Sequence, residues 1–379
     1  MHVCFVLTSP FALNAFVAPA IRALLASGTI VTVVLNASAG PIAADIRPEI
    51  EVLDIEIARD ISPLQDIQSL WSLVRLFRAR HFDIVHSITP KAGLLAMVAA
   101  RIAGIAVRVH TFTGQVWATK QGVWRWSLRL MDKLLAWCST GLLADSASQR
   151  DFLLEEGISS PERLQVLGQG SIAGVDTQRF AAQPVWRARV RQELAIPSDA
   201  VVVVYVGRMH PEKGLVELCS AFAVVAAKLP QVHLLLVGPD EGGLAGGLAT
   251  AAGFCDRIHT VGLTASPENY MAAADIFCLA SYREGFGLSL IEAAAAGLPS
   301  VASRICGVTD AVVSGVTGLL VPPRDVDALA IALCTLAEQP SLRSQLGANA
   351  RHRAEQDFSQ AELVDAWLDF YRRQTFGRS

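Results

Sequence analysis

The feature that most constrains this chain is a repeated alternation of short apolar runs with longer stretches of helical periodicity. In the first half the apolar runs lie at 2–7, 30–35, 50–53, 83–86, 106–110 and 141–144. In the second half they lie at 201–207, 232–238, 257–262, 275–280, 299–303 and 317–321. Continuous apolar runs are typical of strands buried on both faces of a parallel sheet, and the helical stretches supply the crossovers. The pattern therefore predicts an α/β protein.

The length predicts two domains, because 379 residues exceed the roughly 100 to 200 residues usual for one. A polar, Pro-containing stretch near 178–195 separates the two sets of strands and is the expected linker. We expect two doubly wound, Rossmann-like domains at 1–180 and 181–359, with the C-terminal helical segment 360–379 packing back onto the first. Open parallel sheets bind ligands at the carboxyl ends of their strands, so two such domains predict a cleft lined by loops.

Cysteine usage and charge exclude several classes of protein. The seven Cys residues are scattered singly, which predicts neither a zinc site nor a disulfide framework and indicates a reducing, cytoplasmic location. A net charge of −3 argues against nucleic acid as a partner. The first apolar run lacks the basic start and cleavage pattern of a signal peptide, so a strand is expected. The longest candidate for a spanning helix, 92–100, is interrupted by Arg101.

The stretch EGFGLSLIEAAAAGLP, from Glu284 to Pro299, carries the clearest chemical signal. It follows the expected strand at 275–280 and continues into a helix. A helix N-terminus behind a glycine-bearing loop binds anions, because its first amides are unpaired and the helix dipole is positive there. The residues whose backbone would then face a diphosphate are Gly285, Phe286, Gly287 and Leu288.

Two carboxylates, Glu284 and Glu292, bracket this loop and helix start. A carboxylate accepts two hydroxyl hydrogen bonds, so Glu292 suits a ribose diol and Glu284 suits the hydroxyls of a sugar to be transferred. The alternative is structural, with Glu284 as a partner of the helix start and Glu292 as a solvated helix residue. A second loop, GRMHPEKG, favours ligand binding. Its Arg208 and Lys213 follow another strand of the same domain and can neutralise a diphosphate.

Together these motifs resemble the glycosyltransferases of family 4, which have the two-domain GT-B fold and retain the anomeric configuration of the transferred sugar. The resemblance covers nearly the whole chain. Its most specific part is the E-x7-E signature in EGFGLSLIE. GRMHPEKG, VGPDEGG at 237–243 and GVTGLLVPPRD at 315–325 support it.

The resemblance implies roles for the second-domain residues. Arg208 and Lys213 contact the donor diphosphate, Glu284 lies at the transferred sugar and Glu292 at the ribose. The amides of residues 286–288 bind the phosphates. It implies no metal and no other cofactor, since the nucleotide sugar is a substrate. UDP is the expected nucleotide, and an N-acetylhexosamine is the expected type of sugar. Retention is expected to proceed by front-face attack, with the leaving phosphate taking the acceptor's proton.

The first domain matches the family through HSITPKAGLLAMVAARIAGIAVRVHTFTG at 86–114. The resemblance places His110 near the donor sugar and the reacting centre, where we assign it to positioning. A structural role for a single His at a strand end is the alternative. Lys91 is expected on the acceptor side. Many members have a Gly-Gly pair after the first strand. Here TSPFALNAF at 8–16 replaces it, leaving Ser9 and Asn14 as polar groups and predicting a bulkier, more apolar acceptor wall.

A Trp-rich basic helix is expected at 120–139, within a region, 67–140, that has ten Lys/Arg and two acidic residues. Its membrane-facing residues would be Trp124, Arg125 and Arg129. Such a helix can lie in lipid headgroups, which predicts peripheral contact with the anionic inner face of the cytoplasmic membrane. An ordinary helix covering the sheet is the alternative. The region resembles enzymes that build bacterial surface polysaccharides, which implies a polyprenyl-diphosphate-linked saccharide as acceptor.

Two other functions stay open. Sugar-nucleotide epimerases share the GT-B fold and the donor cleft but transfer no sugar. A non-catalytic subunit that binds a nucleotide sugar is the second alternative. The combination of EGFGLSLIE with GRMHPEKG favours a transferase.

Overall fold

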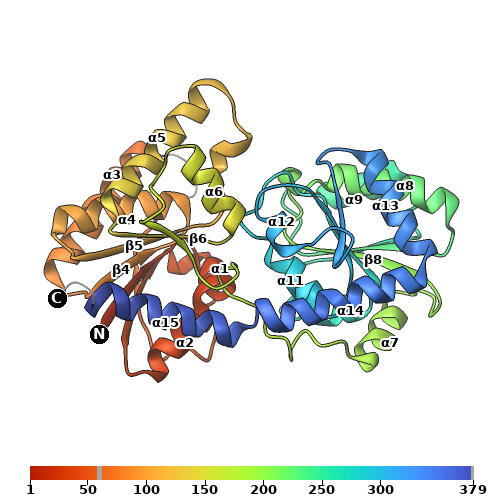
Figure 1. The fold of residues 1–379 in the computed structure, drawn as a ribbon, viewed down its shortest axis with the longest axis horizontal. Helices are drawn as coiled ribbons and strands as arrows, with labels where there is room; N and C mark the ends of the chain where they lie inside the picture. The colour runs from red at the N-terminus through yellow and green to blue at the C-terminus, as the bar shows by residue number, and fades with distance from the viewer. Residues whose placement is uncertain (58–61, 377–379) are drawn as a thin grey trace. The chain divides into compact units, whose positions relative to one another are not determined.

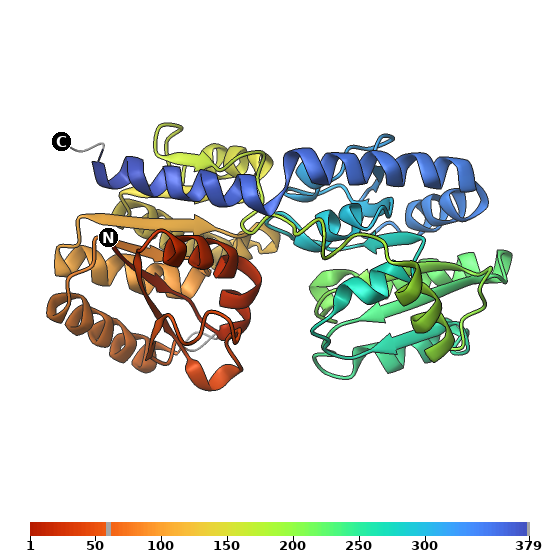
Figure 2. The ribbon, with the colours of Figure 1, turned by 90° about the horizontal axis from the view of Figure 1, so that it is seen from below.

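The computed structural model describes residues 1–57 and 62–376, and the chain divides into two compact units (Figure 1). The first unit comprises residues 1–173 together with the C-terminal segment from Gln360, and the second comprises residues 174–359. Figures 1 and 2 show helices on both faces of each sheet. The expected α/β class, with two Rossmann-like units, is confirmed.

Within the described residues, the first unit contains a seven-stranded parallel sheet in the order β3-β2-β1-β4-β5-β6-β7. The strands are β1 (His2–Val6), β2 (Ile30–Leu35), β3 (Glu51–Asp54), β4 (Ile84–Ser87), β5 (Val107–Phe112), β6 (Gly141–Ala144) and β7 (Leu164–Val166). The α-helices are α1 (Pro10–Ala12), α2 (Ala18–Ala26), α3 (Pro63–Ala79), α4 (Pro90–Ala103), α5 (Gly122–Cys138), α6 (Ala147–Glu155) and α15 (Gln360–Phe376). A π-helical turn (Leu13–Val17) joins α1 to α2, and short 3-10 turns lie at Ala37–Ala39 and Val116–Thr119.

The second unit contains a six-stranded parallel sheet in the order β10-β9-β8-β11-β12-β13. The strands are β8 (Val201–Val206), β9 (Val232–Val237), β10 (Ile258–Val261), β11 (Ile276–Leu279), β12 (Ser300–Ser303) and β13 (Gly318–Val321). The α-helices are α7 (Pro184–Glu193), α8 (Leu215–Lys228), α9 (Leu244–Ala252), α10 (Pro267–Ala272), α11 (Leu288–Ala295), α12 (Val308–Ala311), α13 (Val326–Glu338) and α14 (Pro340–Asp357), with a 3-10 turn at Pro211–Lys213. Strand order reverses between β8 and β11, and a doubly wound sheet binds its ligand at such a switch point.

The expected strands are present, each within two residues at either end, and β7 is a strand that the sequence pattern did not predict. The chain leaves the first unit at residues 173–174, before the expected boundary at 180. The reason is packing, since Val175 and Phe180 are buried in the core of the second unit. The Val175 amide also donates to the Phe358 carbonyl, 2.8 Å away. Residues 174–180 therefore belong to the second unit.

Helix α15 belongs to the first unit and contacts α2. Its Trp367 ring is buried and stacks on His86 of β4, with ring centroids 4.9 Å apart. The Tyr371 hydroxyl lies 2.5 Å from His86 Nδ1, and His86 Nε2 lies 2.8 Å from the Thr111 hydroxyl. Burial holds the pKa of His86 well below its usual value, so the ring is neutral at physiological pH. These contacts join the C-terminal helix to the middle of the first sheet.

Candidate donor site and first-unit surface

Three loops meet at the carboxyl edge of the second sheet, after β8, β9 and β11. A Cβ on Gly214 would lie 2.0 Å from the Ala280 carbonyl oxygen, and one on Gly238 would lie 2.0 Å from that of Gly207. Both glycines have positive φ, so other residues would be strained there. Tyr282 also donates its amide to the Glu212 carbonyl at 2.9 Å. The loops are thus held in backbone contact at the switch point.

The sequence-predicted cations of this edge pair with carboxylates from neighbouring loops. Lys213 Nζ lies 2.6 Å from Glu284 Oε1. Arg208 Nη1 lies 2.9 Å and 3.1 Å from the two carboxylate oxygens of Glu241. Arg208 and Lys213 keep part of their side chains exposed, so both can reach a ligand. The structure therefore brings Arg208, Lys213 and Glu284 together and adds Glu241, which the sequence analysis did not name.

The loop before α11 buries its large side chain and leaves Gly287 partly accessible at the helix start. Gly287 adopts a left-handed conformation, with φ 85°, and is the N-cap of α11 without a side-chain cap. The Phe286 ring is buried and packs edge-on against Phe358, with ring centroids 5.2 Å apart. The first amides of a helix have no partner within it, so the start at Leu288 is suited to an anion. The interpretation of Glu284 as a partner of this helix start is wrong, because its carboxylate pairs with Lys213.

Glu292 lies in the second turn of α11 and differs from a solvated helix residue. Burial raises the pKa of its carboxyl to about 7, although the charge of Arg179 opposes the shift. Arg179 itself pairs with Glu268 at 2.9 Å. None of the hydrogen bonds and ion pairs among the described residues engages the Glu292 carboxyl. A half-buried carboxyl with a perturbed pKa and no protein partner is typical of a binding site.

Metal-binding geometry is not found in the described part of the chain, where no group of three or more His, Cys, Asp or Glu side chains could hold an ion. One D-x-D triplet occurs, at Asp325–Asp327. Asp325 is the N-cap of α13, and its side chain accepts from the Ala328 amide at 2.9 Å. This triplet therefore begins a helix.

In the first unit, His110 is buried on β5. Its Nδ1 lies 2.9 Å from the Ser87 hydroxyl, and its ring packs so closely on α4 that a Cβ on Gly93 would lie 2.4 Å from Cε1. Burial lowers the pKa of His110 to about 3, so the imidazole is neutral at physiological pH and binds a proton weakly. A neutral ring in a fixed orientation suits positioning better than general-base catalysis.

The other first-unit residues proposed for the acceptor side have partners within the protein. The Ser9 hydroxyl caps α1, accepting from the Ala12 amide at 3.4 Å. The Asn14 side chain donates from Nδ2 to the Pro41 carbonyl at 3.0 Å, and its Oδ1 accepts from the backbone amide of Ala43 at 3.0 Å. Lys91, in the first turn of α4, lies 2.6 Å from Asp66 of α3. Each residue thus shapes a loop or helix start near the carboxyl edge of the first sheet.

Helix α5 has a buried and an exposed face. Asp132, Leu135 and Ala136 are buried against the protein. The exposed arc is apolar apart from Ser127 and comprises Val123, Trp124, Trp126, Leu130, Met131, Leu134 and Trp137. Arg125 and Arg129, which we expected to face a membrane, both pair with Glu156. Across the described residues, no helix is both long and apolar enough to cross a bilayer.

Comparison with known proteins gives the family. Residues 187–353 match the model described as glycosyl transferases group 1, and residues 12–170 match the glycosyl transferase 4-like domain. The capsular polysaccharide biosynthesis glycosyltransferase CapM of Staphylococcus aureus is 31% identical over 350 residues, covering 87% of this chain and 89% of CapM.

A second relative is the UDP-Gal:alpha-D-GlcNAc-diphosphoundecaprenol alpha-1,3-galactosyltransferase of Escherichia coli. It is 28% identical over 324 residues, covering 83% of this chain and 81% of that enzyme. Among solved structures, Anabaena Alr3699/HepE in complex with UDP-glucose superposes with a TM-score of 0.80 at 22% identity, covering 98% of this chain and 99% of that one.

The fold is that of the GT-B glycosyltransferases, with two Rossmann-like α/β units. The chain belongs to the group 1 glycosyltransferase family, with a first unit of the glycosyltransferase 4 type, and it is an enzyme of the hexosyltransferase kind.

The half-buried Glu292 carboxyl predicts a pH-dependent stability. Its pKa is raised from 4.5 to about 7 on folding, so its protonated form stabilises the fold and this contribution is lost as pH rises from about 4.5 through 7. Glu292→Gln stays neutral throughout. We expect its melting temperature to exceed that of the wild type at pH 8 and the gap to shrink at pH 5. Glu284→Gln, which loses the Lys213 pair, serves as control and gains nothing at pH 8. A difference in melting temperature between Glu292→Gln and the wild type that does not change with pH would contradict a raised pKa of Glu292.

Proposed function

We propose that this enzyme transfers a hexose-type sugar, such as an N-acetylhexosamine, from a UDP-sugar to a polyprenyl-diphosphate-linked saccharide during the biosynthesis of a bacterial surface polysaccharide. The observation that carries the proposal is the Glu292 carboxyl, half-buried and without a protein partner among the described residues, on a helix that begins at a glycine loop beside two cations. The names of relatives support the process: CapM is named for capsular polysaccharide biosynthesis. The Escherichia coli relative is named for UDP-Gal and a diphosphoundecaprenol acceptor.

The diphosphate of the donor lies against the amides of Phe286, Gly287 and Leu288. Arg208 and Lys213 neutralise the charge that develops on the leaving diphosphate, and the positive end of α11 adds to this effect. These groups supply the electrostatic role that a metal ion has in other transferases, so no metal is required. Arg208 and Lys213 exchange or share their present carboxylate partners when the phosphates arrive.

Glu292 accepts hydrogen bonds from the two ribose hydroxyls, which favours its ionised form and offsets part of the cost of its partial desolvation. Glu284 orients the hydroxyls of the transferred sugar. In the first unit, His110 is neutral and held by Ser87, so its imidazole keeps a fixed orientation that suits positioning a sugar.

Retention of configuration follows from front-face attack. The acceptor hydroxyl approaches the anomeric carbon on the face from which the phosphate departs. The bond between the anomeric carbon and the phosphate oxygen breaks, a new glycosidic bond forms, and the hydroxyl proton passes to the leaving phosphate oxygen. A double displacement would instead require a carboxylate nucleophile and a covalent intermediate.

The donor site is tested by ligand-induced stabilisation, because a ligand that binds only the folded state raises its melting temperature. We expect UDP and UDP-sugars to stabilise the wild type. Arg208→Ala and Glu292→Ala should each weaken UDP binding by about tenfold or more, the effect of losing a hydrogen bond to a charged group. Arg189→Ala, which removes an exposed pair with Glu193 and a contact with the Trp186 ring on the same helix, is the control and should bind as the wild type does. If no nucleoside diphosphate stabilises the wild type, the donor assignment fails.

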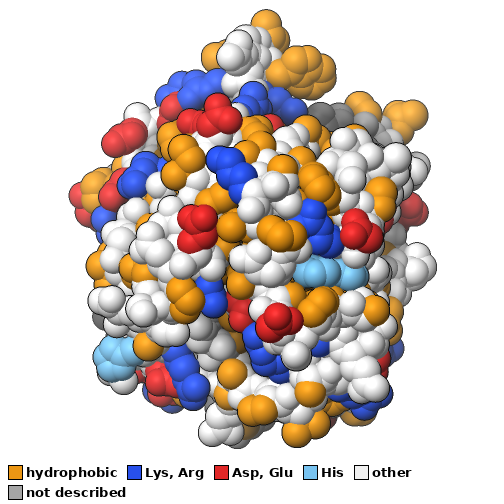
Figure 3. All heavy atoms as spheres, turned by 90° about the vertical axis from the view of Figure 1, so that its right-hand side faces the viewer, with side chains coloured by type: hydrophobic (Ala, Val, Ile, Leu, Met, Phe, Trp, Pro, Cys, Tyr) orange, Lys and Arg blue, Asp and Glu red, His pale blue; other side chains and the backbone are white. Residues whose placement is uncertain are grey.

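The exposed face of α5 is the proposed contact with the inner face of the cytoplasmic membrane. Trp124, Trp126 and Trp137 have 66%, 64% and 59% of their surface exposed. Amphipathic Trp rings on an uncharged arc suit the headgroup region. The exposed cations nearby favour anionic lipid: Lys120 precedes the helix, and Arg101 lies over the Trp137 ring at 3.7 Å. The face of the second unit drawn in Figure 3 instead mixes acidic and basic side chains.

Sedimentation with lipid vesicles tests this surface. We expect the wild type to pellet with vesicles rich in anionic phospholipid and to stay in solution with zwitterionic ones. Serine at Trp124, Trp126 and Trp137 together should abolish pelleting. Trp186→Ser on α7 is the control, and Arg125→Ala should have a small effect because Glu156 already pairs with it. If the triple variant pelleted as the wild type does, or changed only the oligomeric state, the membrane role would be wrong.

A further inference from the structure

The loop at 285–287, which faces the donor diphosphate in the proposed site, contacts the rest of the second unit at two points. Gly307, which precedes α12, approaches so closely that a Cβ there would lie 2.2 Å from the Gly285 carbonyl oxygen. On the other side the Phe358 ring, at the end of α14, packs edge-on against Phe286. The loop backbone at 285–287 therefore rests on α12 and on Phe358, so its position depends on how these two supports are placed.

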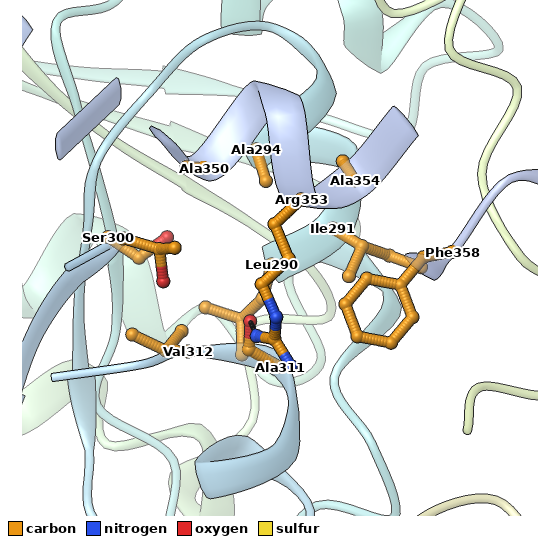
Figure 4. Close-up of a pocket in the computed structure, with 11 residues that line it drawn as sticks. Leu290, Ile291, Ala294, Ser300, Ala311, Val312, Ala350, Arg353, Ala354 and Phe358 are labelled. Carbon is orange, nitrogen blue, oxygen red and sulfur yellow. Dashed lines mark hydrogen bonds between the residues drawn. The ribbon is translucent and has the colours of Figure 1, made fainter. Parts of the chain in front are cut away.

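One side chain joins the two supports. Arg353 of α14 donates from Nη1 to the Ala311 carbonyl at 2.8 Å and from Nη2 to the Asp310 carbonyl at 2.7 Å. Its guanidinium also lies over the Phe358 ring, 4.9 Å from the centroid. Nε donates to Asp357 at 3.1 Å, which fixes the orientation of the guanidinium plane. Figure 4 shows Arg353 extending from its helix toward Ala311, with the Phe358 ring beside it.

The space around Arg353 leaves little freedom. The cavity drawn in Figure 4 has a volume of about 10 Å³, and its lining includes Leu290 and Ile291 of α11. Such a cavity holds one water molecule at most, so it is no substrate site. In a region packed this closely, a change in one side chain is transmitted to its neighbours.

We propose that Arg353 is a positioning residue for donor binding. It holds α12 and the Phe358 ring in fixed positions, and these two supports determine the position of the loop at 285–287. The inference rests on the proposed donor site and adds to it a residue that touches no substrate. Arginine is needed because its planar group donates two parallel hydrogen bonds to adjacent carbonyls and also offers a flat cationic face to an aromatic ring. Lysine can do only one of these at a time.

The chain contains a matched control on the same helix. Arg343 also donates to two backbone carbonyls, those of Leu336 and Ala337, at 2.7 Å and 3.1 Å. It makes no hydrogen bond to α12 and lies in the first turn of α14. Arg343→Met and Arg353→Met therefore each remove hydrogen bonds to two backbone carbonyls, and only the second removes a support of the loop.

The experiment measures UDP affinity, donor KM, kcat and backbone amide hydrogen exchange in Arg353→Met, Arg353→Lys and Arg343→Met. For Arg353→Met we expect UDP affinity to fall and donor KM to rise by about tenfold, with kcat changed less. Arg353→Lys should fall between it and the wild type. Arg343→Met should stay within about twofold of the wild type, whatever its loss in melting temperature. If Arg353→Met does not fold, Phe358→Leu, which removes the ring between Arg353 and Phe286, replaces it with the same expected result.

Hydrogen exchange separates this inference from the proposed function. Amides of residues 285–290 should exchange faster in Arg353→Met than in Arg343→Met, even if no nucleotide binds. Equal exchange in the two variants, or unchanged UDP affinity in a folded Arg353→Met, would overturn the role of Arg353. Failure of the wild type to bind any nucleoside diphosphate, with the exchange difference intact, would instead overturn the donor site and leave the loop support in place.

Discussion

Close backbone contact between loops is the constraint on which the carboxyl edge of the second sheet depends, and the proposed donor site lies at this edge. At Gly214, Gly238 and Gly307 a side chain of any size would place a carbon 2.0–2.2 Å from a neighbouring carbonyl oxygen. Strand β8 lies between β9 and β11, so the loops that follow these three strands are neighbours at one edge of the sheet. The close approaches at the glycines hold these loops against one another. They therefore fix the positions of the paired charges and of the start of α11.

The sequence predicted most of the fold, because a buried parallel strand such as 201–206 is apolar throughout. It missed β7, where three residues pair at the sheet edge and Gln165 interrupts the apolar run. It also placed Arg208 and Lys213 correctly at one edge, because both follow a recognisable strand. Side chains that pair only because the fold brings two separate elements together could not be identified from the local sequence. Glu156, which pairs with Arg125 and Arg129, comes from another helix, and nothing in the local sequence around Arg353 predicts its contact with α12.

The proposed donor site combines well-paired and poorly paired charges. Lys213 and Glu284 pair with each other. The half-buried Glu292 carboxyl has no partner among the described residues, and the charges of Arg179 and Glu268 shift its pKa in opposite directions. A residue that costs stability at neutral pH is expected where a ligand supplies the missing hydrogen bonds. In the first unit, burial likewise disfavours the charged form of His110, whose Nδ1 lies 2.9 Å from the Ser87 hydroxyl.

In the proposed donor site the start of α11 binds the diphosphate and Glu292 binds the ribose. A crystal structure of the enzyme with UDP tests both contacts. We expect phosphate oxygens within hydrogen-bonding distance of the amides of residues 286–288 and of Arg208 or Lys213, with both ribose hydroxyls on Glu292. A nucleotide bound elsewhere, or one whose ribose is turned away from Glu292, would contradict the proposed donor site.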